Sequence, residues 1–159
     1  MRLGLGGNLI VTATERWLAE IRAGRGFMKG ASASAAAGQN PEVQLFNPVA
    51  SGVTVILRMV LASNSVAVDC SFRQFNTALA TLAGEGINLL SGAAAGKGEV
   101  RTATPAAIDG TLIGFIDIPA SQTIQIAPEW MFELGAGEGL HVAGPLAASL
   151  RGLFLWNEV

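Results

Sequence analysis

The stretch FNPVASGVTVILRMVLASN, residues 46–64, decides the predicted fold of this protein. After an asparagine-proline pair and a glycine turn, every second residue from Val53 to Met59 is apolar. Successive side chains of a β-strand point to opposite faces, so this alternation predicts a strand with one apolar face. The segment SVAVDCSFRQF, residues 65–75, repeats the pattern after a short polar turn. We therefore expect the two strands to form an antiparallel hairpin.

The second of these segments contains the single cysteine, Cys70. The alternation places it on the apolar face together with Val66, Val68 and Phe72. We expect Cys70 to be a buried small side chain and not a nucleophile. One cysteine excludes a disulfide within the chain and is consistent with folding in a reducing cytoplasm.

Further strand patterns lie on both sides of this pair, and no long helical pattern separates them. We count about eight strands, which implies an all-β fold, an antiparallel β-sandwich or barrel. A jelly roll is the favoured sandwich, because residues 76–98 suit a long crossover connection; an immunoglobulin-like sandwich is the alternative, without its disulfide. The other strand segments are 43–45, 99–105, 111–119, 122–128, 130–134, 140–142 and 150–156.

Residues 1–40 differ from the rest and predict an N-terminal arm, followed by a sandwich domain over residues 41–159. A short helix is expected over residues 12–23, and the Gly, Ala and Ser residues of 30–40 predict a flexible or extended linker. An ordinary disordered terminus is the alternative, but it would have no need for large apolar side chains. We expect the arm to bind a partner through Trp17, Leu18, Ile21, Phe27 and Met28.

The charge content limits the classes of partner. Charged residues make up 14% of the 159 residues, against about 25% in typical domains. A surface with so little charge is usually covered in an assembly. The net charge is −2 and no basic block is present, so no nucleic-acid partner is expected. No apolar run reaches the roughly 18 residues of a membrane span, and the start does not read as a signal peptide.

Two glycine-rich stretches resemble nucleotide-binding loops only superficially. In GLGGN, residues 4–8, the dinucleotide pattern needs a glycine where Leu9 stands. In GAAAGKG, residues 92–98, the P-loop pattern needs a glycine where Ser91 stands and a hydroxyl residue where Gly98 stands. We therefore expect no nucleotide cofactor.

The titratable residues predict no catalytic centre. His141 is the only histidine and alternates with Leu140 and Val142, so it is expected to face out from a strand. One histidine and one cysteine cannot build a typical zinc site within one chain, although symmetry-related copies of His141 could bind an ion in an oligomer. No serine-nucleophile elbow is present, and the glutamates between residues 129 and 138 lack a sugar-binding aromatic cluster. We expect no enzyme activity, no cofactor and no metal.

Five segments carry a resemblance to a known family: FNPVASGVTVILRMVLASN, VDCSFRQFNTAL, TLIGFIDIPASQTIQIAPEW, LGAGEGLHVAG and LRGLFLWNEV. Together they resemble small structural proteins of tailed bacteriophages. The resemblance covers residues 42–159 and leaves the first 40 residues out. It implies a jelly-roll-like virion component, either a head decoration (cement) protein or a tail-associated protein. It carries over no catalytic residues.

These observations lead to three functional hypotheses. The first is a capsid decoration protein, expected to be a homotrimer, that binds the major capsid protein or other virion proteins after assembly in the host cytoplasm. The second is a tail, collar or fibre-associated protein that attaches virion parts or binds a host receptor. The third is a small β-barrel enzyme or ligand-binding module, which would need a deep polar pocket with converging carboxyl groups.

Overall fold

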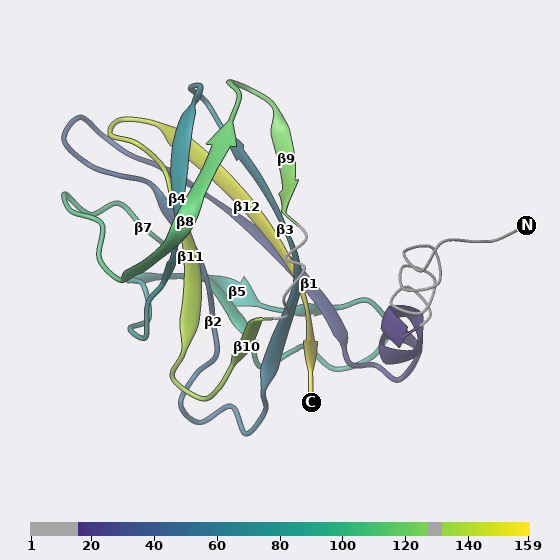
Figure 1. Ribbon diagram of the computed structural model, residues 1–159. Coiled ribbons are helices and arrows are strands. Elements are labelled where there is room, and N and C mark those ends of the chain that lie inside the picture. Colours follow the sequence, from purple (N-terminus) through teal and green to yellow (C-terminus); the bar gives the residue numbers. More distant parts are fainter. Residues whose placement is uncertain (1–15, 127–131) are drawn as a thin grey trace, which may run out of the picture.

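The computed structural model describes residues 16–126 and 132–159. A helix covers residues 16–22, and twelve strands follow within the described residues. Figure 1 shows them in chain order. The strands are β1 (Gly26–Ser34), β2 (Glu42–Phe46), β3 (Val55–Asn64), β4 (Val68–Gln74), β5 (Thr81–Glu85), β6 (Ile87–Asn88), β7 (Glu99–Ala103), β8 (Thr111–Ile118), β9 (Thr123–Ile126), β10 (Phe132–Leu134), β11 (Gly139–Ala143) and β12 (Ser149–Glu158).

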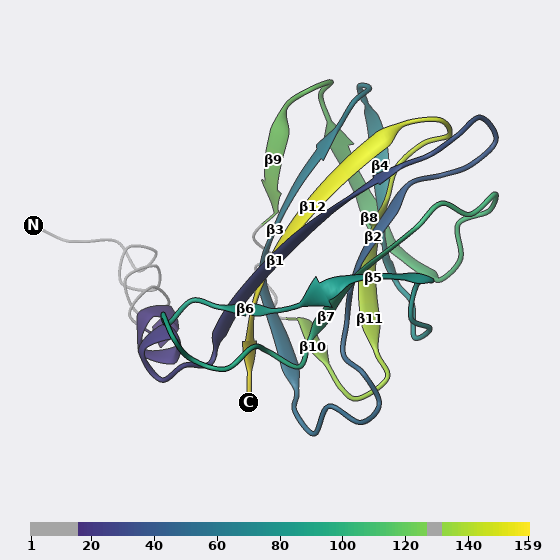
Figure 2. The ribbon, with the colours of Figure 1, turned by 180° about the vertical axis from the view of Figure 1, so that it is seen from behind.

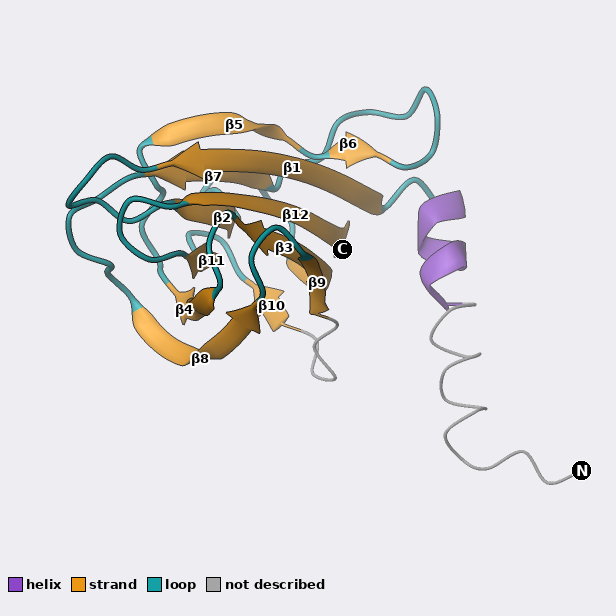
Figure 3. Ribbon diagram, turned by 90° about the horizontal axis from the view of Figure 1, so that it is seen from above, coloured by secondary structure: helices purple, strands orange, loops and turns teal. Residues whose placement is uncertain are grey.

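The strands form two antiparallel sheets that pack face to face, which confirms the predicted all-β sandwich. One sheet has the order β10-β3-β12-β1-β6, with β9 also paired to β3, and is called here the β12 sheet. The other has the order β5-β7-β2-β11-β4-β8 and is called the β11 sheet. Figures 1 and 2 show the sheets from front and back, and Figure 3 shows both layers from above.

The chain crosses between the sheets at most of its connections. β1 and β3 lie in the β12 sheet, whereas β2 and β4 lie in the β11 sheet. The predicted hairpin of β3 with β4 is therefore wrong: β3 pairs with β12, and β4 pairs with β11 and β8. Alternation along a strand shows which of its faces is apolar. It does not show whether the next strand pairs with it in the same sheet or packs against it from the facing sheet.

The segment expected to be a linker contains a central strand. β1 pairs with β12 over all nine residues, from Gly26 to Ser34, so this part of the predicted arm belongs to the sandwich. The backbone supplies the hydrogen bonds of a sheet, and these do not require large side chains. Small residues also suit the close approach of the strands, because a Cβ on Gly30 would lie 3.2 Å from the carbonyl oxygen of Gly152. The linker prediction is therefore wrong for residues 30–34.

A β-bulge in the β3–β12 pairing explains which side chains of β3 enter the core. The register shifts between Leu155 and Trp156, opposite the step from Met59 to Leu57. Val55 and Leu57 point into the core, as predicted. After the bulge the next inward side chain is Val60, and Met59, which was predicted to point inward, faces outward. A bulge changes the side-chain alternation by one residue, so a strict period of two cannot place every residue correctly.

The core lies between the sheets and is closed by large side chains of β12. Phe154 and Trp156 are fully buried there, as is Leu150, and all three share one face as the sequence predicts. Cys70 and Phe72 on β4 are also buried, as expected, whereas Val66 precedes β4 and is 44% exposed. The predicted crossover over residues 76–98 contains two strands, because β5 extends the β11 sheet and β6 pairs with β1.

Candidate interaction surface

The helix over residues 16–22 lies outside the sandwich, beyond the start of β1 (Figure 3). Its last turn is closed by hydrogen bonds from the backbone N–H of Ala23 to the carbonyl of Ala19 (3.0 Å) and from Gly24 to Ile21 (2.9 Å). Gly24 has a φ of 74°, the left-handed conformation that commonly ends helices and that glycine adopts without strain. The predicted helix end at Gly24 is therefore confirmed, while Thr14, its proposed cap, lies outside the described residues.

Three hydrogen bonds attach the base of this helix to the sandwich. The side-chain amide of Asn88 donates to the carbonyl oxygen of Gly24 (2.7 Å). The carbonyl oxygen of Arg25 accepts from the backbone of Glu158 (3.1 Å) and from the side chain of Asn157 (3.3 Å). The helix therefore leaves the body of the protein from a fixed base, not from a flexible linker.

An apolar surface extends over the helix and the segment next to it. Leu18 on the helix is 44% exposed, and Ile87 and Leu90 in the neighbouring segment are 58% and 41% exposed. Leu90 also packs against Gly24, because a Cβ there would lie 3.8 Å from its Cδ2 atom. We call residues 16–25 together with residues 86–96 the arm platform. Residues 86–96 were not identified from the sequence as part of an interaction surface, because their many small side chains are typical of a loop. The apolar residues in the run INLL, residues 87–90, could have indicated it.

The five predicted arm residues fall into two groups. Trp17, Leu18 and Ile21 lie on the platform helix, with Leu18 the most exposed of the three. Phe27 is 5% exposed and stacks on Trp156, with ring centroids 6.2 Å apart, so its assignment to a docking surface is wrong. Met28 is half-buried in β1, where it pairs with Leu155 and Ile87 at the edge of the platform. Phe27 lies in the core because every second side chain of β1 points inward, and Phe27 occupies one of these positions.

The stretch GAAAGKG binds a carboxylate, but one from its own chain. The Glu158 side chain accepts hydrogen bonds from the backbone N–H of Lys97 (2.8 Å) and Gly98 (2.8 Å) and from Nε1 of Trp156 (3.0 Å). A Cβ on Gly96 would lie 2.6 Å from Oε1 of Glu158, so the glycines permit this close approach. The stretch therefore fixes the platform to the end of β12.

A buried polar pair lies on the outer side of the β11 sheet. His141 lies on the face opposite Leu140 and Val142, as predicted, but it is fully buried and therefore not solvent-facing. Phe75 covers it, with ring centroids 5.6 Å apart. Neither His141 nitrogen has a hydrogen-bond partner among the described residues, and the same holds for Oε1 of the buried Glu42. The burial of His141 was not predicted from the sequence, because the segment that covers it, the chain after β4, comes from another part of the sequence.

Burial shifts the protonation of both groups toward the neutral form. The pKa of His141 is lowered to about 4, mainly by burial and also by the nearby Arg73, while Asp109 acts in the opposite direction. The pKa of Glu42 is raised to about 7, mainly by burial and also by Asp109, while Arg73 acts in the opposite direction. Burial also raises the pKa of the Cys70 thiol to about 11, so this thiol is protonated at neutral pH and is a poor nucleophile.

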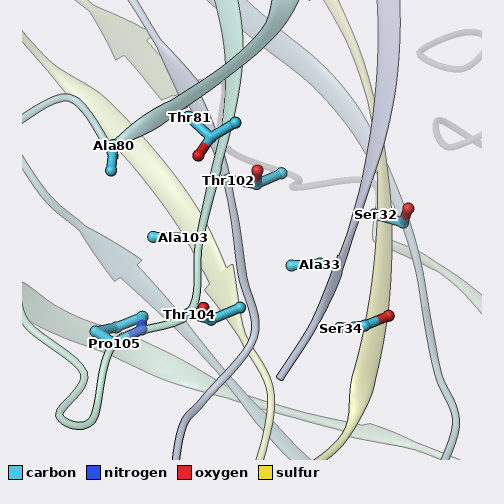
Figure 4. Close-up of a pocket in the computed structure, with 9 residues that line it drawn as sticks. All are labelled: Ser32, Ala33, Ser34, Ala80, Thr81, Thr102, Ala103, Thr104 and Pro105. Atoms are coloured by element: carbon cyan, nitrogen blue, oxygen red, sulfur yellow. The ribbon is translucent and has the colours of Figure 1, made fainter. Parts of the chain in front are cut away.

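The space between the free edges of the sheets forms a cleft of about 520 Å³ (Figure 4). Its lining comes from β1, from β5 and β7, and from the residues next to them, and consists only of Ser, Thr, Ala and Pro side chains. These side chains can form hydrogen bonds but supply no acid, base or metal ligand. Within residues 16–126 and 132–159, no group of three or more His, Cys, Asp or Glu side chains could hold a metal ion.

Comparison with known proteins returned no match: no protein-family model, curated protein or solved structure is significantly similar to this chain. In the described part of the chain, no helix has the length and apolar character needed to cross a membrane.

Proposed function

We propose that this protein is a non-enzymatic structural protein of a tailed-bacteriophage virion, most specifically a capsid decoration (cement) protein. The observation that carries this proposal is the arm platform, an anchored projection that exposes Leu18, Ile87 and Leu90. Contiguous exposed apolar side chains mark protein-binding surfaces. Covering them in a complex contributes roughly 25 cal/mol per Å² before ordering costs. The partner in this proposal is the major capsid protein or another virion protein.

The strand order supports the same class of protein. We assign the sandwich to the jelly-roll class, because β1, β12, β3 and β9 lie side by side in one sheet and β2, β11, β4 and β8 in the other. This order follows from winding paired antiparallel strands across two sheets, as two Greek keys do. Jelly rolls occur in viral capsid proteins as well as in lectins and cupins, so the assignment is compatible with a virion role and does not define one.

A second exposed surface supports association with sister chains. β8 is an edge strand of the β11 sheet, and it exposes Phe115 (65%), Ile113 (44%) and Leu112 (43%). An edge strand with exposed apolar side chains is a template for pairing with another chain. In the proposed decoration protein this edge forms contacts within a homo-oligomer, for which we propose a trimer, while the arm platform binds the shell.

Removing the platform helix should abolish binding to particles without unfolding the sandwich. A variant lacking residues 1–22 keeps β1 intact, so we expect the β-sheet signal of the wild type in circular dichroism but no co-sedimentation with phage particles that lack this protein. A longer deletion through residue 30 is not a usable test, because it removes Phe27 and half of β1.

A pair of point variants provides the matched control for this deletion. Ile87→Asp places a charge on the platform, whereas Leu146→Asp places one on an equally exposed leucine outside it, both residues being 58% exposed. We expect Ile87→Asp to reduce particle binding at least about tenfold and Leu146→Asp to leave it unchanged. Full binding by the deletion variant, or equal losses for the two aspartates, would contradict the proposed docking surface.

A tail, collar or fibre-associated attachment protein is the second candidate function. It is favoured by two adjoining cavities on the β12 sheet whose linings share Ser63, Thr123 and Arg151, side chains that can form hydrogen bonds to a small ligand. The position of the protein in an electron-microscopy map of the intact particle separates this candidate from the first.

A further inference from the structure

One row of outward side chains crosses four neighbouring strands of the β12 sheet. Arg151 on β12 pairs directly with Ser32 on β1 and with Ser63 on β3, and Ser63 in turn pairs with Thr123 on β9. Directly opposed residues of antiparallel strands share a face, so three hydroxyl groups and one guanidinium group lie side by side. The row is therefore a fixed part of the sheet and not a property of a mobile loop.

Two adjoining cavities lie along this row. The first, of about 590 Å³, and the second, of about 290 Å³, share Ser63, Thr123 and Arg151 in their linings. Ser149 and Ser65 line the second cavity, where the Ser65 hydroxyl accepts a hydrogen bond from the backbone N–H of Ser149 (2.9 Å). We call the combined feature the hydroxyl groove and define it by Ser63, Ser65, Thr123, Ser149 and Arg151.

Arg151 supplies the only charge among the described lining residues of the groove. Across residues 16–126 and 132–159, its side chain makes no hydrogen bond or ion pair within the protein. A guanidinium group carries five N–H donors in a planar fork that matches a carboxylate. The groove therefore contains the positively charged guanidinium group of Arg151 and, among its described lining residues, no carboxylate that would neutralise it.

The next row of the sheet gives the groove an apolar floor. Leu153 pairs with Leu61, and both are half-buried and line the larger cavity. On the other side of Leu153 lies Gly30, which has no side chain to fill the space above it. Hydroxyl groups, one cation and an apolar strip thus meet within one elongated depression.

We propose that the hydroxyl groove binds an acidic saccharide, a sugar that carries a carboxylate. The carboxylate accepts hydrogen bonds from Arg151, the sugar hydroxyls exchange hydrogen bonds with the serine and threonine side chains, and the C–H face of the ring rests on Leu61 and Leu153. A lone inorganic anion would leave most of the two cavities unfilled. Charge-assisted bidentate bonds from arginine to a carboxylate are shorter and stronger than neutral ones, so they set the preference for an acidic sugar.

This inference does not rest on the proposed docking of the arm platform. The groove is centred on Arg151, whereas the platform is attached at Glu158, which is seven residues and about 20 Å further along β12. A protein bound to a shell through the platform can therefore keep the groove free.

The test is a titration of the full-length protein followed by nitrogen–proton NMR of its backbone amides. Methyl glucuronide is the acidic probe, and methyl glucoside is its neutral counterpart. We expect methyl glucuronide to shift the amides of Ser63, Thr123 and Ser149, with at least about tenfold weaker binding of methyl glucoside. Arg151→Gln should weaken methyl glucuronide binding to the level of the neutral probe, and Arg22→Gln, a loss of the same charge from the exposed helix, should leave it unchanged.

Three outcomes overturn the proposal. These are equal affinity for the two sugars, unchanged binding of methyl glucuronide by Arg151→Gln, and equal shifts of the same amides by inorganic phosphate alone. The last would make the groove a general anion site. Because no particle is needed, a failure here leaves the docking proposal standing, and a failure of the deletion experiment leaves this one standing.

Discussion

Replacing Trp156 by alanine is expected to lower the free energy of unfolding by about 3–5 kcal/mol. The Trp156 side chain is fully buried, stacks on Phe27 and donates a hydrogen bond from Nε1 to Glu158 (3.0 Å). Its loss leaves a large cavity and removes one of the donors to a buried carboxylate. Typical domains have a total stability of only about 5–15 kcal/mol, so this variant should be partly or largely unfolded at 37 °C.

Urea unfolding followed by circular dichroism measures this effect. Trp156→Phe keeps most of the ring contacts but removes the donor, so we expect a loss intermediate between wild type and Trp156→Ala. Trp17→Ala on the platform helix is the control, with an expected loss below about 1 kcal/mol, because Trp17 is only half-buried and lies outside the core. Equal losses for Trp17→Ala and Trp156→Ala would contradict the assignment of β12 as the centre of the core.

Single replacements of Glu42 and His141 are expected to give opposite dependences of stability on pH. The Glu42 pKa rises from 4.5 to about 7 on folding, so its contribution is present at low pH and is lost as pH rises through that range. The His141 pKa falls from 6.5 to about 4, so its contribution is present above pH 6.5 and is lost as pH falls toward 4. Each contribution is about 3 kcal/mol, and in the wild type they largely offset each other where the ranges overlap.

The measurement is the free energy of unfolding from urea curves at several pH values between 4 and 8. In Glu42→Gln only the histidine contribution remains, so the free energy of unfolding of this variant should rise by about 3 kcal/mol from pH 4 to pH 6.5. In His141→Gln only the glutamate contribution remains, so the free energy of unfolding of this variant should fall by a similar amount from pH 4.5 to pH 7. Slopes of the opposite sign would contradict the assignment of both groups as neutral buried side chains whose pKa values are shifted by burial.

The sandwich could be predicted from the sequence because its strands alternate apolar and polar residues. The alternation in β3 and β4 identified the inward side chains Val55, Leu57, Cys70 and Phe72. It could not identify the neighbours of these strands, since pairing depends on contacts between residues far apart in the chain. Nor could it detect β1, whose Gly, Ala and Ser residues give no period and are held by backbone hydrogen bonds to β12.

The candidate surface could be predicted only in part. Trp17, Leu18 and Ile21 stood out because a helical pattern placed them on one face before a glycine stop. Phe27, only a few residues further on, is equally apolar but belongs to the core, and sequence alone does not distinguish a core side chain from an exposed one. The hydroxyl groove was not foreseeable, because its members come from separate strands and meet only through the register of the sheet.

The pairing of β1 with β12 also determines when the protein can fold. Arg25 and Asn157, which bond at one end of this strand pair, are 132 residues apart in the chain. During synthesis, β1 leaves the ribosome long before its neighbour exists, so the β12 sheet cannot close until residues 149–157 have also been made. Topologies with many such distant pairings fold slowly and expose unpaired strand edges meanwhile. We therefore expect the nascent chain to depend on chaperones more than a helical protein of the same length would.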